Sequence, residues 1–159
     1  MAGADGNVSV RLDGDRILVT PRGLPKSDLR AADLVVVDPA GTHRGGFRKA
    51  TSELDLHLRV YQERVDVGAV VHAHPPVATG LGVAGEGLPG DVLPELILTL
   101  GEVPLVPYAT PGAPAVGAVV APYARTHEGV LLANHGAVTW AGDLLTARIR
   151  MESLEHAAR

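Results

Sequence analysis

Two histidines separated by one residue are the part of this sequence best placed to do chemistry. His72 and His74 follow the apolar run 68–71. In a β-strand, residues i and i+2 point to the same face, so both imidazoles would lie side by side at a strand end. A third histidine, His135, lies near the end of a second apolar stretch, 130–136. Together these residues predict a metal site with three imidazole ligands.

Each of these histidines also has an ordinary structural explanation. A lone histidine at a strand end is more often hydrogen-bonded than bound to a metal. The pair is different, because two protonated imidazoles repel each other whereas two neutral ones can share a cation. Glu53 begins a predicted helix that leads into the His72 strand, so it either favours the helix dipole or returns to the histidines as a carboxylate. His57, one helical turn later on the same face, has the i, i+4 spacing of a ligand pair with Glu53, but we favour packing or hydrogen bonding for it.

The elements that would position these residues are short and mixed. Alternating residues predict strands at 8–12 and 16–20, which the turn 13–15 joins into a hairpin. A compact β run at 34–37 is followed by a turn that leads into another short strand. The first part of the chain is therefore predicted to be antiparallel.

Predicted helices alternate with buried strands in the rest of the chain. Leu54, Leu58 and Tyr61 share one stripe of a helix that Thr51, Ser52 and Glu53 introduce. The other predicted elements are helices at 78–83, 94–101, 113–123 and 143–159, an interrupted strand at 103–106, and a strand through His135 that continues to Trp140. This pattern predicts an α/β domain with a mostly antiparallel central sheet covered by helices.

The composition excludes several classes of protein. The chain has 159 residues, 46% of them hydrophobic, which is enough for one domain over 1–159 with a buried core. A net charge of -4 with scattered Lys and Arg offers no basic surface for nucleic acid. Without cysteine, a metal would need imidazole and carboxylate ligands. No signal peptide or membrane-spanning stretch is evident, so we expect a cytoplasmic protein that does not bind membranes.

Sequence blocks along almost the whole chain resemble the class II aldolase/adducin family. The blocks, in the order typical of that family, are 6–10, 17–23, 51–53, 70–74, 107–110 and 132–136. The resemblance implies a three-layer α/β/α fold with a mostly antiparallel central sheet. It also implies a homotetramer with active sites between subunits. The N-terminal helix and the C-terminal tail of the family, with its tyrosine, have no counterpart in this sequence.

The resemblance also implies roles for the metal-site residues. His72, His74 and His135 would bind Zn²⁺ or another divalent cation such as Mn²⁺ or Co²⁺. Glu53 would complete the resting coordination shell and then act as a base when substrate displaces it. A cation held by three neutral imidazoles keeps open positions, so it can polarise the carbonyl of a sugar phosphate or hydroxy-ketone and stabilise an enediolate.

A phosphate-binding region follows from the same resemblance. By position in the motifs, Asn7, Gly23, Thr51 and Ser52 resemble the phosphate-binding groups of the family. Backbone N–H groups and hydroxyls at a helix start suit an anion, although each residue also fits a simple turn or helix cap. Arg22 occupies a position where many relatives carry Ser or Thr. It either reinforces the anion site or indicates a substrate with a carboxylate or of a different size.

The reaction itself is less closely defined. Glu95 lies near the position of a tyrosine that aldolases of this family take from a neighbouring subunit, and an acid there resembles the dehydratase branch. Its ordinary interpretation is a solvent-facing helix acid. The leading hypothesis is a zinc-dependent aldolase that cleaves or forms a small sugar phosphate of the L-fuculose-1-phosphate type, through dihydroxyacetone phosphate and an aldehyde. The alternatives are a metal-dependent dehydratase, decarboxylase or 4-epimerase, or a non-catalytic adducin-like interaction domain.

Overall fold

One mixed β-sheet forms the centre of the protein. The computed structural model describes residues 5–13 and 15–159, so Gly14 of the predicted turn 13–15 lies outside the described residues. The strand order in the described part is β4-β3-β2-β1-β5-β8-β7-β6. The strands are β1 (Asn7–Leu12), β2 (Arg16–Val19), β3 (Val35–Val37), β4 (His43–Gly45), β5 (Ala69–Ala73), β6 (Leu105–Val106), β7 (Gly129–Leu132) and β8 (Gly136–Ala141).

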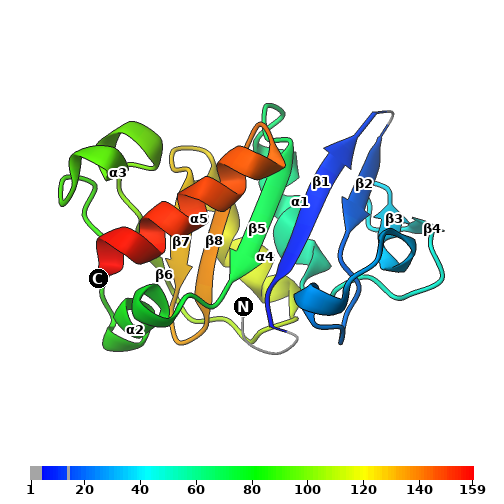
Figure 1. Cartoon of the computed structure of the whole chain (residues 1–159), viewed down its shortest axis with the longest axis horizontal. Helices are drawn as coiled ribbons and strands as arrows, with labels where there is room; N and C mark the ends of the chain where they lie inside the picture. The colour runs from blue at the N-terminus through cyan, green and yellow to red at the C-terminus, as the bar shows by residue number, and fades with distance from the viewer. Residues whose placement is uncertain (1–4, 14) are drawn as a thin grey trace.

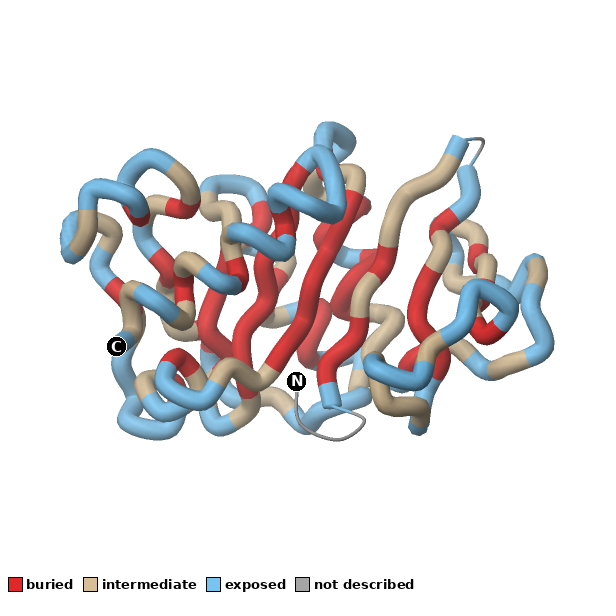
Figure 2. The backbone as a smooth tube through the Cα atoms, in the orientation of Figure 1, coloured by how far each residue is buried: buried red, intermediate tan, exposed pale blue. Residues whose placement is uncertain are grey.

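Helices cover both faces of this sheet, which gives the three layers that the resemblance implied (Figure 1). The helices are α1 (Leu54–Glu63), α2 (Pro76–Ala84), α3 (Pro94–Thr99), α4 (Pro114–Ala124) and α5 (Leu144–Ala158). One core lies between the sheet and α1 and α4, and it contains Trp140 and Val60. The other core lies under α2, α3 and α5 and contains Leu96 and Leu154. The central strands are buried on both faces (Figure 2).

The predicted fold class is confirmed, but the sheet is mixed and not purely antiparallel. Strands β6 and β7 pair in parallel, while the other strand pairs in the sheet are antiparallel. The reason is the connection, because the chain leaves β6, passes through α4 and enters β7 from the same end. A β-strand, helix, β-strand order was visible in the sequence at 103–132, so the parallel pair could have been predicted there.

The predicted continuous strand from Val130 to Trp140 was wrong. The chain instead turns at 133–135, and β7 and β8 form an antiparallel hairpin. Asn134 takes the left-handed conformation that the turn requires, with φ of 57°. Asparagine tolerates this conformation better than most residues, so it was the overlooked turn signal. The turn places His135 directly before β8.

Strand register brings the chemical residues to one end of the sheet. Asn7 at the start of β1 is the direct partner of His72 near the end of β5. Ala73 pairs with Ala137 on the other side of β5, close to the turn that carries His135. These strand ends meet at the lower edge of the sheet in Figure 1. In the described residues, no helix is long and apolar enough to cross a membrane.

Candidate metal centre

Four side chains from separate segments converge at this end of the sheet. His72 lies in β5, His74 follows that strand, His135 lies in the β7–β8 turn, and Glu53 is the N-cap residue of α1. The ring centroids of the three histidines lie 4.8 to 5.0 Å apart. Their potential ligand atoms all lie within 4.8 Å of one another. The sequence-based grouping of these residues therefore corresponds to a compact cluster.

A close backbone approach holds His74 beside the hairpin. Gly136 lies so near to β5 that an added Cβ would meet the carbonyl oxygen of Ala73 and Cδ2 of His74, each at 2.6 Å. Distances below 3.0 Å do not occur between a real Cβ and such atoms. A residue without a side chain is therefore needed at this position if the three histidines are to meet.

The hydrogen bonds of His72 define which of its nitrogens faces the cluster. Nδ1 of His72 lies 2.9 Å from the carbonyl oxygen of Ala137, so Nδ1 carries the hydrogen that this acceptor needs. In the neutral ring, Nε2 then carries a lone pair. That atom lies 3.1 Å from Nε2 of His74 and 3.2 Å from Oε2 of Glu53. Possible metal-ligand atoms therefore converge at this point, where a shared cation would bind them.

Glu53 supplies the negative charge of the cluster. Its side chain is 10% exposed, and Oε1 lies 3.2 Å from Nε2 of His135. Oε1 is nevertheless one of the described buried side-chain atoms without a hydrogen bond. Burial opposes ionisation of Glu53, but the neighbouring imidazoles of His135 and His72 and the amide of Asn7 outweigh it and hold the carboxyl pKa below its ordinary value. Glu53 is therefore a carboxylate at neutral pH.

The electrostatics of the histidines also favour metal binding. Burial lowers the pKa of His74, and the neighbouring rings of His72 and His135 lower it further. A neutral imidazole offers the lone pair that a metal needs. In a tetrahedral zinc site, nitrogen ligands at about 2.0–2.1 Å from the ion lie roughly 3.3 Å apart. Nε2 of His72 lies 3.1 Å from Nε2 of His74, and the carboxylate oxygens of Glu53 lie 3.2 Å from Nε2 of His72 and of His135, so the residues present fit a divalent cation of the zinc type.

A cavity of about 240 Å³ opens beside Glu53, His74 and His135. The predicted substrate-binding residues Asn7, Arg22, Gly23, Thr51 and Ser52 all line it. Gly23 has φ of 71°, which favours glycine at this loop position. The cavity therefore joins the candidate metal cluster to the region where the resemblance places a phosphate.

The cavity has one cationic residue that the sequence interpretation passed over. Lys26 lines it together with Arg22, and its Nζ donates to the carbonyl oxygen of Leu24. Burial lowers the pKa of Lys26, while the nearby carboxylate of Asp5 opposes this shift. The only sequence signal was its place four residues after Arg22 in the same loop. Two cationic side chains, Arg22 and Lys26, therefore line the cavity.

Glu95 is not brought to this cavity within the chain. It lies on α3 and lines a separate depression with residues of α5 such as Ile149 and Glu152. The sequence interpretation gave it a role across a subunit boundary, and that assignment stays a prediction. The interpretation of His57 as a packed, hydrogen-bonded residue is confirmed, since it is fully buried and contacts Asn7 and Ser9.

The fold and the cluster define the class of protein. The class II aldolase and adducin N-terminal domain family matches residues 1–159, and the chain belongs to this family. The chain is 35% identical over 161 residues to the 3-oxo-tetronate 4-phosphate decarboxylase of Haemophilus influenzae, covering 99% of this chain and 76% of that protein. It is 34% identical to the L-fuculose phosphate aldolase of Methanococcus maripaludis, covering 100% of this chain and 85% of that protein.

Solved structures give the same result for the fold. An L-fuculose 1-phosphate aldolase has a TM-score of 0.94 at 34% identity, covering 99% of this chain and 74% of that chain. A putative aldolase/epimerase/decarboxylase from Escherichia coli has a TM-score of 0.92 at 33% identity, covering 99% of this chain and 77% of that chain. The similar proteins therefore include more than one lyase reaction on the same fold.

Proposed function

We propose that the protein is a metal-dependent lyase that cleaves or forms a carbon–carbon bond near the carbonyl group of a small sugar phosphate. The convergence of three imidazoles and an ionised, buried carboxylate beside a cavity is the observation that carries this proposal. A non-catalytic interaction domain would have no use for three converging imidazoles and an acid beside a cavity.

Different residues along the cavity would bind the metal, move the proton and bind the phosphate. His72, His74 and His135 would hold Zn²⁺, or a similar divalent cation, which when bound would stabilise negative charge that develops on the substrate carbonyl oxygen. Glu53 lies next to this position with a free oxygen, so it would move a proton at the carbon beside the carbonyl. The backbone at Gly23, the hydroxyls of Thr51 and Ser52, and the cations Arg22 and Lys26 would bind the phosphate.

Aldol cleavage of the L-fuculose-1-phosphate type is our leading reaction. It would divide the substrate into dihydroxyacetone phosphate and an aldehyde, and a group must accept the proton of the substrate hydroxyl whose carbon becomes the aldehyde. Glu95 of a neighbouring subunit is our candidate for that group. This step requires the homotetramer with shared active sites, which we also propose.

Decarboxylation of a 3-oxo sugar-acid phosphate is the second candidate. A carboxylate that leaves as carbon dioxide needs no acceptor for a hydroxyl proton, so the site of one chain would suffice. The product on the phosphate side is again dihydroxyacetone phosphate. The two cations Arg22 and Lys26 favour this candidate, because they suit a substrate with a carboxylate as well as a phosphate. The similarity to 3-oxo-tetronate 4-phosphate decarboxylases points the same way.

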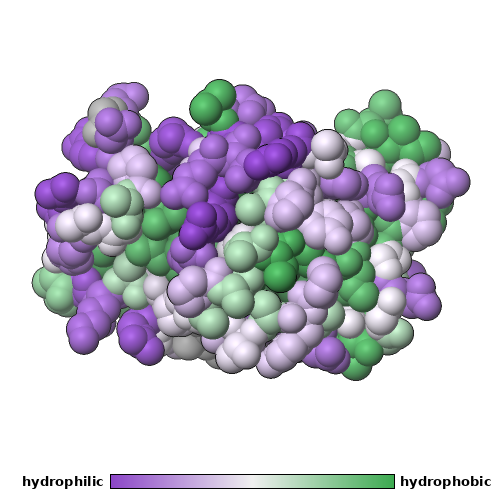
Figure 3. Space-filling model, turned by 180° about the vertical axis from the view of Figure 1, so that it is seen from behind, coloured by the Kyte–Doolittle hydropathy of each residue, from purple (hydrophilic) through white to green (hydrophobic). Residues whose placement is uncertain are grey.

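Exposed apolar surface supports the proposed assembly. Ile97 and Leu98 of α3 are 59% and 86% exposed. The view from behind shows hydrophobic surface at the upper right, the corner where α3 lies (Figure 3). Apolar side chains grouped at one corner are typical of a surface that another subunit covers.

The test measures product formation from each of two candidate substrates. The purified protein, loaded with Zn²⁺, is incubated with L-fuculose 1-phosphate and, separately, with 3-oxo-tetronate 4-phosphate, with and without a chelator. We expect one substrate to release dihydroxyacetone phosphate, and the chelator to abolish the release. The released partner, an aldehyde or carbon dioxide, identifies the reaction. Release from neither substrate, or release that the chelator leaves unchanged, would contradict the proposal.

A further inference from the structure

A row of polar side chains runs through the otherwise apolar core between β1 and α1. The strand advances about 6.7 Å in two residues and the helix about 6.0 Å in four. Polar residues at every second position of the strand therefore remain opposite polar residues at every fourth position of the helix. The strand contributes Asn7, Ser9 and Arg11, and the helix side contributes Glu53, His57 and Tyr61. We call these six residues the polar ladder.

The ladder is hydrogen-bonded without a break from Tyr61 to Glu53. The hydroxyl oxygen of Tyr61 lies 2.9 Å from Oγ of Ser9, which in turn lies 2.7 Å from Nδ1 of His57. Nε2 of His57 lies 2.5 Å from Oδ1 of Asn7, and Nδ2 of Asn7 lies 2.8 Å from Oε2 of Glu53. Each residue therefore contacts the next through one specific atom.

The direction of these hydrogen bonds follows from the last acceptor. A carboxylate only accepts, so Asn7 must turn its NH₂ group to Glu53 and its oxygen to His57. That oxygen needs a donor, so the hydrogen of His57 is on Nε2. Nδ1 of His57 then accepts from the hydroxyl of Ser9, and Ser9 accepts from the hydroxyl of Tyr61. Only this tautomer of His57 satisfies every group in the row.

Burial makes an incomplete ladder unfavourable. His57 is 0% exposed, Ser9 1% and Asn7 4%. A buried polar group without a partner destabilises a protein, whereas a complete network holds its members in one arrangement. If the Asn7 amide were reversed, its oxygen would face the carboxylate of Glu53 and its NH₂ group would face the hydrogen on His57. The ladder therefore fixes how this amide is oriented.

We infer that His57 is a positioning residue for Glu53, acting through Asn7. By orienting the Asn7 amide, His57 places a donor on Oε2 of Glu53 and leaves Oε1, which makes no hydrogen bond, as the oxygen that carries the proton. The inference rests on the proposed function, in which Glu53 is the base. It assigns a role to a buried histidine that does not touch the substrate or the metal.

The first test measures the tautomer of His57 directly. Nitrogen-15 NMR of histidine-labelled, zinc-loaded protein distinguishes the two neutral tautomers, and the H57Q variant identifies the signals of His57. We expect the hydrogen on Nε2. A hydrogen on Nδ1, or on both nitrogens at neutral pH, would overturn the inference because Asn7 would then not be held in the required orientation.

The second test separates positioning from packing. H57L keeps much of the volume but removes both hydrogen bonds, whereas the amide nitrogen of H57Q can replace Nε2 as the donor to Asn7. We expect H57L to lower kcat about 10- to 100-fold with little change in KM or in bound metal, as is typical when a hydrogen bond behind a catalytic group is removed. H57Q should recover most of that loss. If H57L will not fold, the nitrogen-15 measurement above, which needs only the wild-type protein and H57Q, still decides the inference.

The matched control is V60A on the same helix. Val60 is 0% exposed in the apolar core and takes no part in the ladder. It should lower the melting temperature without lowering kcat. An unchanged kcat in H57L, or equal losses of kcat in H57L and V60A, would overturn the inference. This failure differs from failure of the proposed function, in which the wild-type protein itself forms no product.

Discussion

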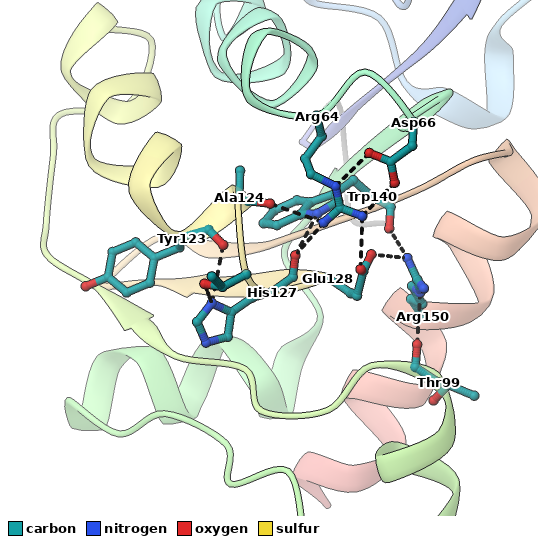
Figure 4. Close-up of polar contacts among 10 residues, drawn as sticks. Arg64, Asp66, Thr99, Tyr123, Ala124, His127, Glu128, Trp140 and Arg150 are labelled. Atoms are coloured by element: carbon teal, nitrogen blue, oxygen red, sulfur yellow. Dashed lines mark hydrogen bonds and ion pairs between the residues drawn. The ribbon is translucent and has the colours of Figure 1, made fainter.

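The two ends of the central strands both carry clusters of charged or titratable groups, but these groups are paired in different ways. At the end opposite the histidines, Arg64 donates to Asp66 and Glu128, and Arg150 donates to the other oxygen of Glu128 (Figure 4). These arginines also donate to backbone carbonyls, including that of Ala124. At the histidine end, imidazole nitrogens and the carboxylate oxygens of Glu53 lie 3.1 to 3.2 Å apart.

The difference indicates which end is structural and which is functional. Every charge at the arginine end has an opposite charge or a hydrogen-bond partner, so this cluster is complete and holds the ends of β5, β7 and β8 together. The histidine end instead gathers three imidazoles and one carboxylate in an arrangement that suits a metal ion. We therefore interpret it as the site of chemistry.

The largest expected effect comes from removing one imidazole at the histidine end. H135A should lose its bound metal and lower activity by at least about 100-fold, because a ligand matters more than the groups that support it. Metal analysis and the lyase assay check this, and circular dichroism should show an unchanged fold. A variant that retained a full complement of metal would show that His135 is not a ligand.

Replacing one glutamate by glutamine at each end should distinguish the catalytic role of one end from the structural role of the other. E53Q keeps the size of the side chain but removes the charge, so it should retain metal and suppress proton exchange at the carbon beside the substrate carbonyl by about 10²- to 10⁴-fold. Proton NMR of dihydroxyacetone phosphate in deuterated water measures this exchange. Exchange at the wild-type rate in E53Q would remove Glu53 from the role of base.

E128Q is the corresponding change at the arginine end. It should weaken the charge-assisted hydrogen bonds to Arg64 and Arg150 and lower the free energy of unfolding by about 1–2 kcal/mol, or roughly 2–8 °C in melting temperature. Activity should stay near the wild-type value. Calorimetry and the lyase assay together check this, and a loss of activity at unchanged stability would contradict the division between the two ends.

A smaller effect is expected from the titration of His57. Burial, assisted by the nearby His72, lowers its pKa to about 3 in the folded protein, against about 6.5 in the unfolded chain. Between these values the unfolded chain binds the additional proton, so the free energy of unfolding should fall as pH falls through this window. In H57Q that fall should be shallower. Urea unfolding at several pH values in the presence of a chelator measures it, and parallel curves for the two proteins would show that His57 does not contribute.

The candidate metal ligands could be predicted from the sequence, but not the whole candidate site. His72 and His74 could be predicted because two-residue periodicity is a local property of strands, and Glu53 because one helix links it to the same strand. The position of Lys26 in the cavity could not be predicted, because it depends on how a loop folds over the strand ends. The polar ladder was also hidden, since the match between β1 and α1 is set by tertiary packing and not by either segment alone.

Anomalous diffraction at the zinc edge, from crystals of the Zn²⁺-loaded protein, tests the central claim most directly. We expect one ion per chain, at about 2.0–2.1 Å from Nε2 of His72, His74 and His135. Zinc bound only elsewhere, or no zinc peak among these nitrogens at stoichiometric loading, would contradict it.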